Sequence, residues 1–128
     1  MDASDFLRGG CYALALWLHG KTDLPLYGLY DDHGEMQHAM VGDHDAERFY
    51  DARGRVPAVA VRMMRGRPCA GSDLRETTVE EVRAMRDLAA RHGNPSPTDR
   101  QVAAFARKSP YLREIVEAGP VPAPAPRP

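Results

Sequence analysis

Three residues whose types serve covalent catalysis follow one another along the chain: Cys11, His38 and Asp51. A cysteine attacks an amide or ester carbonyl when its sulfur is a thiolate, a base lies beside it, and a third group holds that base in the right tautomer. A free thiol has a pKa of about 8.5 and is largely protonated at neutral pH. Such chemistry therefore needs Cys11 at a position that favours the thiolate.

The residues around Cys11 predict the start of a helix. Gly9 and Gly10 break regular structure and let backbone segments approach closely. Residues 11–19 (CYALALWLH) are apolar on nearly every side, which is typical of a buried helix. The helix dipole and the free N–H groups of a first turn favour a thiolate, and they can also stabilise an oxyanion on a substrate. Cys11 is therefore the candidate nucleophile.

His38 and Asp51 fall on two neighbouring predicted strands. The alternation in MQHAMV predicts that His38 shares one strand face with Met36 and Met40. Antiparallel strands joined by a short turn bring positions such as His38 and Asp51 side by side. Asp51 would then accept a hydrogen bond from one ring nitrogen and leave the other nitrogen for the sulfur.

The other segments predict an α+β fold, in which the N-terminal helix with Cys11 packs on a small antiparallel sheet and C-terminal helices follow. The predicted strands are residues 26–30, 36–41, 48–52 and 56–64. Residues 65–75 are predicted to be a basic connection. Thr77 or Thr78 caps a helix that ends at His92-Gly93, and helices at 99–108 and 111–118 follow. We expect one domain over 1–118 and a disordered Pro/Ala-rich tail over 119–128.

Three short motifs together resemble the core of the papain-like and transglutaminase-like cysteine enzymes: GGCYALA at 9–15, HAMV at 38–41 and FYDARG at 49–54. The resemblance implies that Cys11 is the nucleophile, His38 the base and Asp51 the orienting acid. The compact size looks more like the small toxin, deamidase and phage-associated members. The segment before Cys11 offers no Gln or Asn to match an oxyanion residue.

The resemblance implies a hydrolase or acyl-transfer enzyme that acts on an amide through a thioester intermediate. Peptidase, isopeptidase and glutamine deamidase activities share that intermediate, and the small size favours a side-chain amide or isopeptide on a protein or peptide substrate. An acyltransferase with a thioester donor is an alternative. A non-catalytic protein-binding module with the same fold is another, in which the three residues serve packing and turns.

Composition and charge indicate which classes of partner the chain can bind. The chain of 128 residues has a net charge of -1, so it has no electrostatic footprint for nucleic acid or an anionic membrane. Its longest apolar run is too short to span a bilayer, and no basic segment precedes that run as in a signal peptide. Two cysteines are too few for a disulfide scaffold. We expect a cytoplasmic protein, or one exported without a cleavable signal; the sequence leaves its oligomeric state open.

Other chemically capable residues form weaker patterns. A set of turn residues suggests a metal site at first sight but lacks tight ligand spacing, so we assign neither a metal nor a cofactor: His33, Asp43, His44 and Asp45. Cys69 follows a basic loop without an acid or histidine to serve it. A cluster of arginines nearby is typical of a solvated face: Arg62, Arg65 and Arg67.

Overall fold

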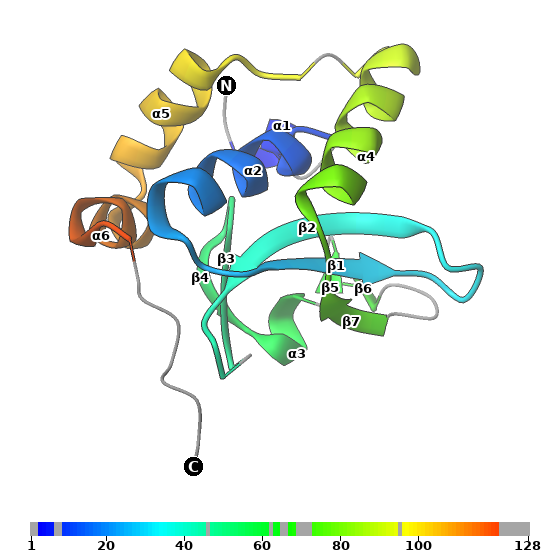
Figure 1. Cartoon of the computed structure of the whole chain (residues 1–128), viewed down its shortest axis with the longest axis horizontal. Coiled ribbons are helices and arrows are strands. Elements are labelled where there is room, and N and C mark those ends of the chain that lie inside the picture. The colour runs from blue at the N-terminus through cyan, green and yellow to red at the C-terminus, as the bar shows by residue number, and fades with distance from the viewer. Residues whose placement is uncertain are drawn as a thin grey trace.

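The computed structural model describes residues 3–6, 9–45, 47–61, 63–64, 67–68, 73–94 and 96–120. Its helices are α1 (Ala3–Phe6), α2 (Cys11–Thr22), α3 (Ala58–Val61), α4 (Val79–Arg91), α5 (Asp99–Lys108) and α6 (Pro110–Ala118). Its strands are β1 (Leu26–Tyr30), β2 (Met36–Gly42), β3 (Arg48–Asp51), β4 (Gly54–Pro57), β5 (Met63–Met64), β6 (Arg67–Pro68) and β7 (Asp73–Glu76). The predicted fold class is confirmed: α2 packs on an antiparallel sheet, and α4, α5 and α6 follow it (Figure 1).

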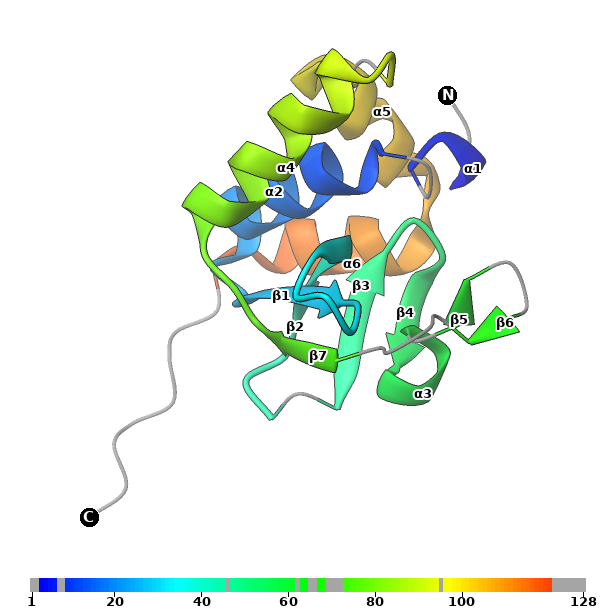
Figure 2. The same cartoon turned by 90° about the vertical axis from the view of Figure 1, so that its right-hand side faces the viewer.

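The sheet that carries the site has the strand order β4-β3-β2-β1-β7, and all its neighbouring strands are antiparallel. β5 and β6 form a separate pair. Helices α2 and α4 cover one face of the larger sheet, and the short helix α3 lies on the other side (Figure 2). Buried apolar side chains accordingly form two clusters, one that includes α2 with Cys11 and one that includes Val61 of α3.

Helix α2 presents one fully apolar face to the sheet. The buried residues that recur at helical spacing on this face are Cys11, Leu14, Ala15 and Leu18. The helix does not end after His19 as predicted but continues through Gly20 to Thr22. The Thr22 hydroxyl donates to Leu18 O (2.7 Å), which satisfies a carbonyl of the last turn. Asp23 then ends the helix in the left-handed conformation, at φ 55°.

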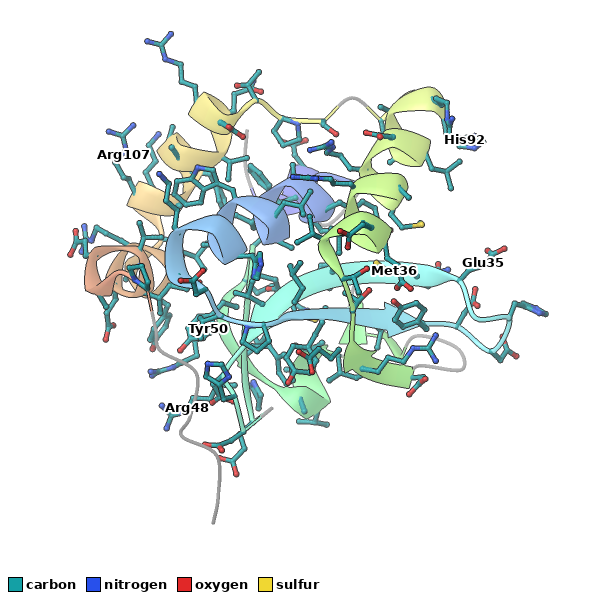
Figure 3. The ribbon with its side chains drawn as sticks, in the orientation of Figure 1. Glu35, Met36, Arg48, Tyr50, His92 and Arg107 are labelled. Carbon is teal, nitrogen blue, oxygen red and sulfur yellow. The ribbon has the colours of Figure 1, made fainter. Side chains whose placement is uncertain are left out.

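A bulge in β2 changes the predicted orientation of one residue. Two successive residues of β1 pair with His38 and then with Met36, so Gln37 is the extra residue. Met36 consequently packs in the same cluster as Ala39, near α4 (Figure 3), whereas Met40 packs in the other cluster. The prediction that Met36 shares a face with Met40 is wrong, because strict alternation does not continue through a bulge.

The predicted fourth strand is wrong in its length. β4 ends at Pro57, and the chain turns into α3. Proline has no N–H for a sheet ladder, and its fixed φ suits the entry to a helix. Within α3, Val61 is fully buried while Val59 is 73% exposed. A strand with a period of two would place these two side chains on the same face.

Strand β7 begins inside residues 65–75, where a connection was predicted, and the two-residue β6 also lies there. It pairs with β1 and forms one edge of the sheet. Its sequence DLRE lacks the apolar alternation of a half-buried strand, and its side chains are mostly exposed. Polar and charged residues are common at sheet edges, where they discourage pairing with another chain. Hydrophobic patterning therefore gave no signal for β7.

Helices α4 and α5 begin at threonine caps, Thr78 and Thr98, and Ser109 precedes α6. Thr78 accepts a hydrogen bond from Glu81 N (3.2 Å), but the Glu81 carboxylate accepts from the Tyr30 hydroxyl (2.6 Å) and so ties α4 to β1. At α5 the exchange is reciprocal: Thr98 accepts from Gln101 N, and Gln101 Oε1 accepts from Thr98 N (2.9 Å). Both caps satisfy N–H groups that have no partner inside a helix.

Several predictions concern residues outside the described ranges. These residues include Arg62, Arg65, Cys69 and most of the predicted tail, from 121 to 128. The division into one domain and a tail stays a prediction. In the ranges that are described, no helix is both long and apolar enough to cross a bilayer.

We expect alanine substitutions at Gly10, the N-cap of α2, and at Gly20, inside α2, to have opposite effects on the stability of the protein. A Cβ at Gly10 would lie 2.8 Å from Asp5 O and 3.2 Å from Phe6 Cα, so Gly10→Ala forces backbone to move. We expect it to lower the free energy of unfolding by about 1–3 kcal/mol. A Cβ at Gly20 meets nothing within 4 Å. Gly20→Ala should raise that free energy by about 0.5–1 kcal/mol, because alanine favours a helix.

Urea unfolding of the two variants beside wild type measures both effects. Equal stabilities of Gly10→Ala and wild type would show that α1 does not press against the start of α2.

Candidate active site

Cys11 is the first residue of α2, and glycine makes its position possible. Gly10 is the N-cap, and its N–H donates to Asp5 O (3.3 Å) across a contact that leaves no room for a side chain. The close backbone approach expected of the double glycine is therefore present at Gly10. The Cys11 side chain lies on the face of α2 that packs on the sheet, and only 3% of the residue is exposed. The predicted placement of Cys11 in a first helical turn is confirmed.

His38 lies in β2, opposite Leu29 of β1, and is completely buried. Its Nε2 lies 2.9 Å from Asp51 Oδ2. An ionised carboxylate can only accept, so Nε2 is the donor of this bond. The structure thus brings His38 and Asp51 together as the sequence predicts, and the bond fixes the orientation of the ring.

The second ring nitrogen of His38 is left free by the bond to Asp51. Nδ1 is buried and has no hydrogen-bond partner, sulfur included, among the residues that the structure describes. Cys11 lies near enough for its charge to raise the pKa of His38. Since Asp51 occupies Nε2, we assign the sulfur to the Nδ1 side. The site therefore consists of a hydrogen-bonded His38–Asp51 pair with Cys11 close to the ring.

The His38 ring carries a proton more readily than an ordinary imidazole. Burial by itself lowers the pKa of His38, but the negative charge of Cys11 and the hydrogen bond and charge of Asp51 outweigh it and raise the pKa to about 9. An imidazolium is therefore the favoured form at neutral pH in this site. A buried cation of this kind needs paired negative charge close by.

Asp51 is held by more than the histidine. It ends β3, and the Ala52-Arg53 turn leads into β4, where Gly54 (φ 94°) pairs with Asp51. Arg53 donates to Asp51 through its backbone N (2.8 Å to Oδ1), its Nε (3.2 Å to Oδ1 and 3.1 Å to Oδ2) and its Nη2 (2.6 Å to Oδ2). Burial raises the pKa of Asp51, yet the bonds from His38 and Arg53 hold that pKa well below its usual range.

Arg53 is a site residue that the sequence analysis missed. Besides Asp51, its guanidinium donates to Ala60 O (2.8 Å) and reaches Val61 O (3.5 Å) in α3. It therefore joins the turn after β3 to the helix behind the sheet. The available signal was the DAR tripeptide, in which an acid precedes an arginine by two residues in a turn. A turn of that kind can fold the guanidinium back on the carboxylate.

Tyr12 fixes the start of α2 against the strand that carries His38. Its hydroxyl donates to Met36 O across 3.4 Å in a buried setting. Burial, reinforced by the negative charge of the neighbouring Cys11, holds the pKa of Tyr12 well above its usual range. The phenol therefore stays neutral at physiological pH and serves as a hydrogen-bond donor beside the nucleophile candidate.

The assembled site is closed. His38 has no exposed surface, Asp51 exposes 2% and Cys11 exposes 3%. The pockets lined by residues that the structure describes include one between α2 and α4 and one between β1 and α4, and Cys11, His38 and Asp51 line neither of them. A substrate carbonyl can meet the sulfur only after neighbouring residues move.

The residues considered for a metal do not gather into a site. Within the described part of the chain, no group of three or more His, Cys, Asp or Glu residues could hold a metal ion. His33 lies in the exposed β1–β2 turn, where its ring is 3.9 Å from Asp32. Asp43 instead organises the next turn by accepting from Glu47 N (3.0 Å).

Comparisons with known proteins add no identity to this geometry. No family model, curated protein or solved structure matches the chain. The site must therefore be interpreted from its own contacts.

The buried Asp51 predicts a specific pH dependence. Both of its oxygens accept only from N–H donors, so Asp51→Asn turns one acceptor into a donor that faces another donor. We expect it to lower the free energy of unfolding at pH 7 by about 3 kcal/mol. The folded pKa of Asp51 lies below that of an aspartate in an unfolded chain, so its stabilisation is present above the unfolded pKa and is lost as pH falls.

The stability difference between wild type and Asp51→Asn should accordingly narrow from pH 5 towards pH 3, measured by urea unfolding at each pH. Asp87→Asn, at an exposed aspartate of α4, is the matched control and should differ little from wild type throughout. A difference that stays constant down to pH 3 would contradict an ionised, hydrogen-bonded Asp51.

Proposed function

We propose that the chain is a cysteine-nucleophile enzyme of papain-like or transglutaminase-like type that acts on an amide through a thioester. The observation that carries the proposal is the buried His38–Asp51 pair with Cys11, at the start of α2, close to the ring. Each residue has the chemical character and the neighbour that its role needs. Cys11 is the nucleophile, His38 the base and acid, and Asp51 the group that orients the ring.

The proposed reaction needs one proton to move between two atoms. With the proton of the Cys11 thiol already on His38 Nδ1, the sulfur forms a bond to the carbonyl carbon of the substrate. The tetrahedral intermediate collapses as the imidazolium gives its proton to the leaving nitrogen, and the C–N bond breaks. Water then attacks the thioester, with its proton taken by His38, and the acid leaves as the thiol is restored.

Asp51 and Arg53 support that proton transfer without taking part in it. The bond from Nε2 to Asp51 keeps the proton on Nε2, so that Nδ1 is the nitrogen that exchanges a proton with sulfur. Arg53 keeps the carboxylate charged, and that negative charge stabilises the imidazolium. Arg53 is therefore a positioning residue.

The nature of the amide is open between related substrates. A peptide bond, an isopeptide bond and a glutamine side chain all give the same thioester with Cys11. If an amine or a second acyl acceptor attacks in place of water, the same site becomes an acyltransferase. Either route starts with exposure of the sulfur, since Cys11 is almost fully covered.

A non-catalytic protein-binding module is the second candidate, and the closure of the site favours it. A histidine at 0% exposure bonded to a buried aspartate is also a way to satisfy polar groups inside a core. In that case Cys11 is a buried packing residue. The two candidates differ in whether the sulfur reacts while the protein is folded.

Thiol alkylation as a function of pH separates the two candidates. We expect folded protein in a Cys69→Ser background to add iodoacetamide at Cys11, with a rate that changes only a few-fold between pH 6 and pH 8. The alkylation rate of an ordinary thiol with a pKa of about 8.5 would fall about tenfold for each unit by which the pH is lowered in this range. Because the site is closed, the absolute rate of alkylation is low. The quantity to compare is therefore the ratio of the alkylation rates at pH 8 and pH 6, followed by intact mass.

His38→Gln should restore the ordinary tenfold dependence, and Cys11→Ala should show no adduct. If Cys11 stays unmodified in the folded protein but reacts in urea, the binding module is the better description. If wild type and His38→Gln share one pH profile, His38 does not activate the sulfur.

A further inference from the structure

Helix α2 borders a surface pocket with a second face, separate from the one that carries Cys11. A pocket of about 620 Å³ lies between α2, α4 and the start of α5. The residues of α2 that line it recur at helical spacing: Ala13, Leu16, Trp17 and Gly20. The residues that pack on the sheet, such as Cys11 and Leu18, belong to the other face. The volume falls within the range of small-molecule sites, about 300–1,000 Å³.

Cationic side chains gather around this pocket, which we call the Trp17 pocket. Lys21 comes from α2, with its Nζ 5.6 Å from the centre of the Trp17 ring, and Arg83 and Arg86 come from α4. Asp99 also lines the pocket and offsets part of this charge. Arg86 contacts Asp87 (3.3 Å), but this pair is exposed and such pairs bind weakly. The pocket therefore carries an excess of positive charge in a chain whose net charge is -1.

A polar group in the wall of the pocket has no partner. Ser96 Oγ is buried and makes no hydrogen bond within the described part of the chain. Buried hydroxyls are normally satisfied, and one that is not marks a place for a ligand or water. The positive end of the α5 dipole begins two residues later at its cap, Thr98, which also lines the pocket.

We propose that the Trp17 pocket binds a small molecule that carries a phosphate or diphosphate group. Arg83 and Arg86 supply guanidinium groups, which suit phosphate oxygens. Ser96 and Trp17 line the same pocket, and the Trp17 ring supplies an apolar wall for the rest of the ligand. The proposal rests on this pocket alone and is independent of the chemistry assigned to Cys11.

Trp17 is the single tryptophan of the chain, so tryptophan fluorescence measures changes at this pocket. We expect inorganic pyrophosphate to change its fluorescence in a saturable manner at constant ionic strength, with sodium chloride as the blank. Arg83→Gln/Arg86→Gln should weaken the affinity at least tenfold, because each lost bond to a charged group costs about that factor. Calorimetry on the same samples detects binding that leaves the emission unchanged.

Arg107→Gln/Arg113→Gln is the control with an equal loss of charge. Both residues are exposed and do not line the pocket, and Arg107 points away from the molecule on α5 (Figure 3). This control should bind pyrophosphate within twofold of wild type, as should Cys11→Ala. No saturable binding by either method, or equal weakening in both arginine pairs, would overturn the proposal.

Discussion

The buried carboxylate of Asp51 is the constraint on which the site depends. A charge with 2% exposure is tolerated only where donors surround it, and His38 and Arg53 supply those donors from β2 and from the turn after β3. The same bonds orient the imidazole towards Cys11 and attach the β3–β4 hairpin to α3. The donors that stabilise the buried Asp51 carboxylate thus also fix the position of the proposed base, His38, beside the proposed nucleophile.

Glycine and tyrosine complete this arrangement at the other end of the chain of contacts. Gly10 lets the backbone at Asp5 and Phe6 approach the first turn of α2 more closely than any side chain would allow. Tyr12 attaches the same turn to the backbone of β2. The start of α2 is therefore fixed both from its N-terminal side and from the sheet.

The sequence predicted the parts of the structure that local patterns control. Apolar runs predicted the start of α2 and the whole of β1, and threonine caps predicted the starts of α4 and α5. The order of Cys11, His38 and Asp51 along the predicted elements indicated that the three residues lie close together, and in the structure His38 is bonded to Asp51 and lies near Cys11. The rest depends on tertiary context. β7 is a polar edge strand without apolar alternation, and the alternating alanine and valine of α3 also fit a strand. The bond from Arg53 to Asp51 depends on the conformation of the turn between β3 and β4.

The closure of the site also bears on the chemical lifetime of the sulfur. Oxidation of a thiolate to sulfenic and then to irreversible sulfinic acid requires both its charge and access by peroxide. Only 3% of Cys11 is exposed, which withholds the access. The fold therefore keeps an oxidation-sensitive atom out of contact with solvent oxidants in this structure.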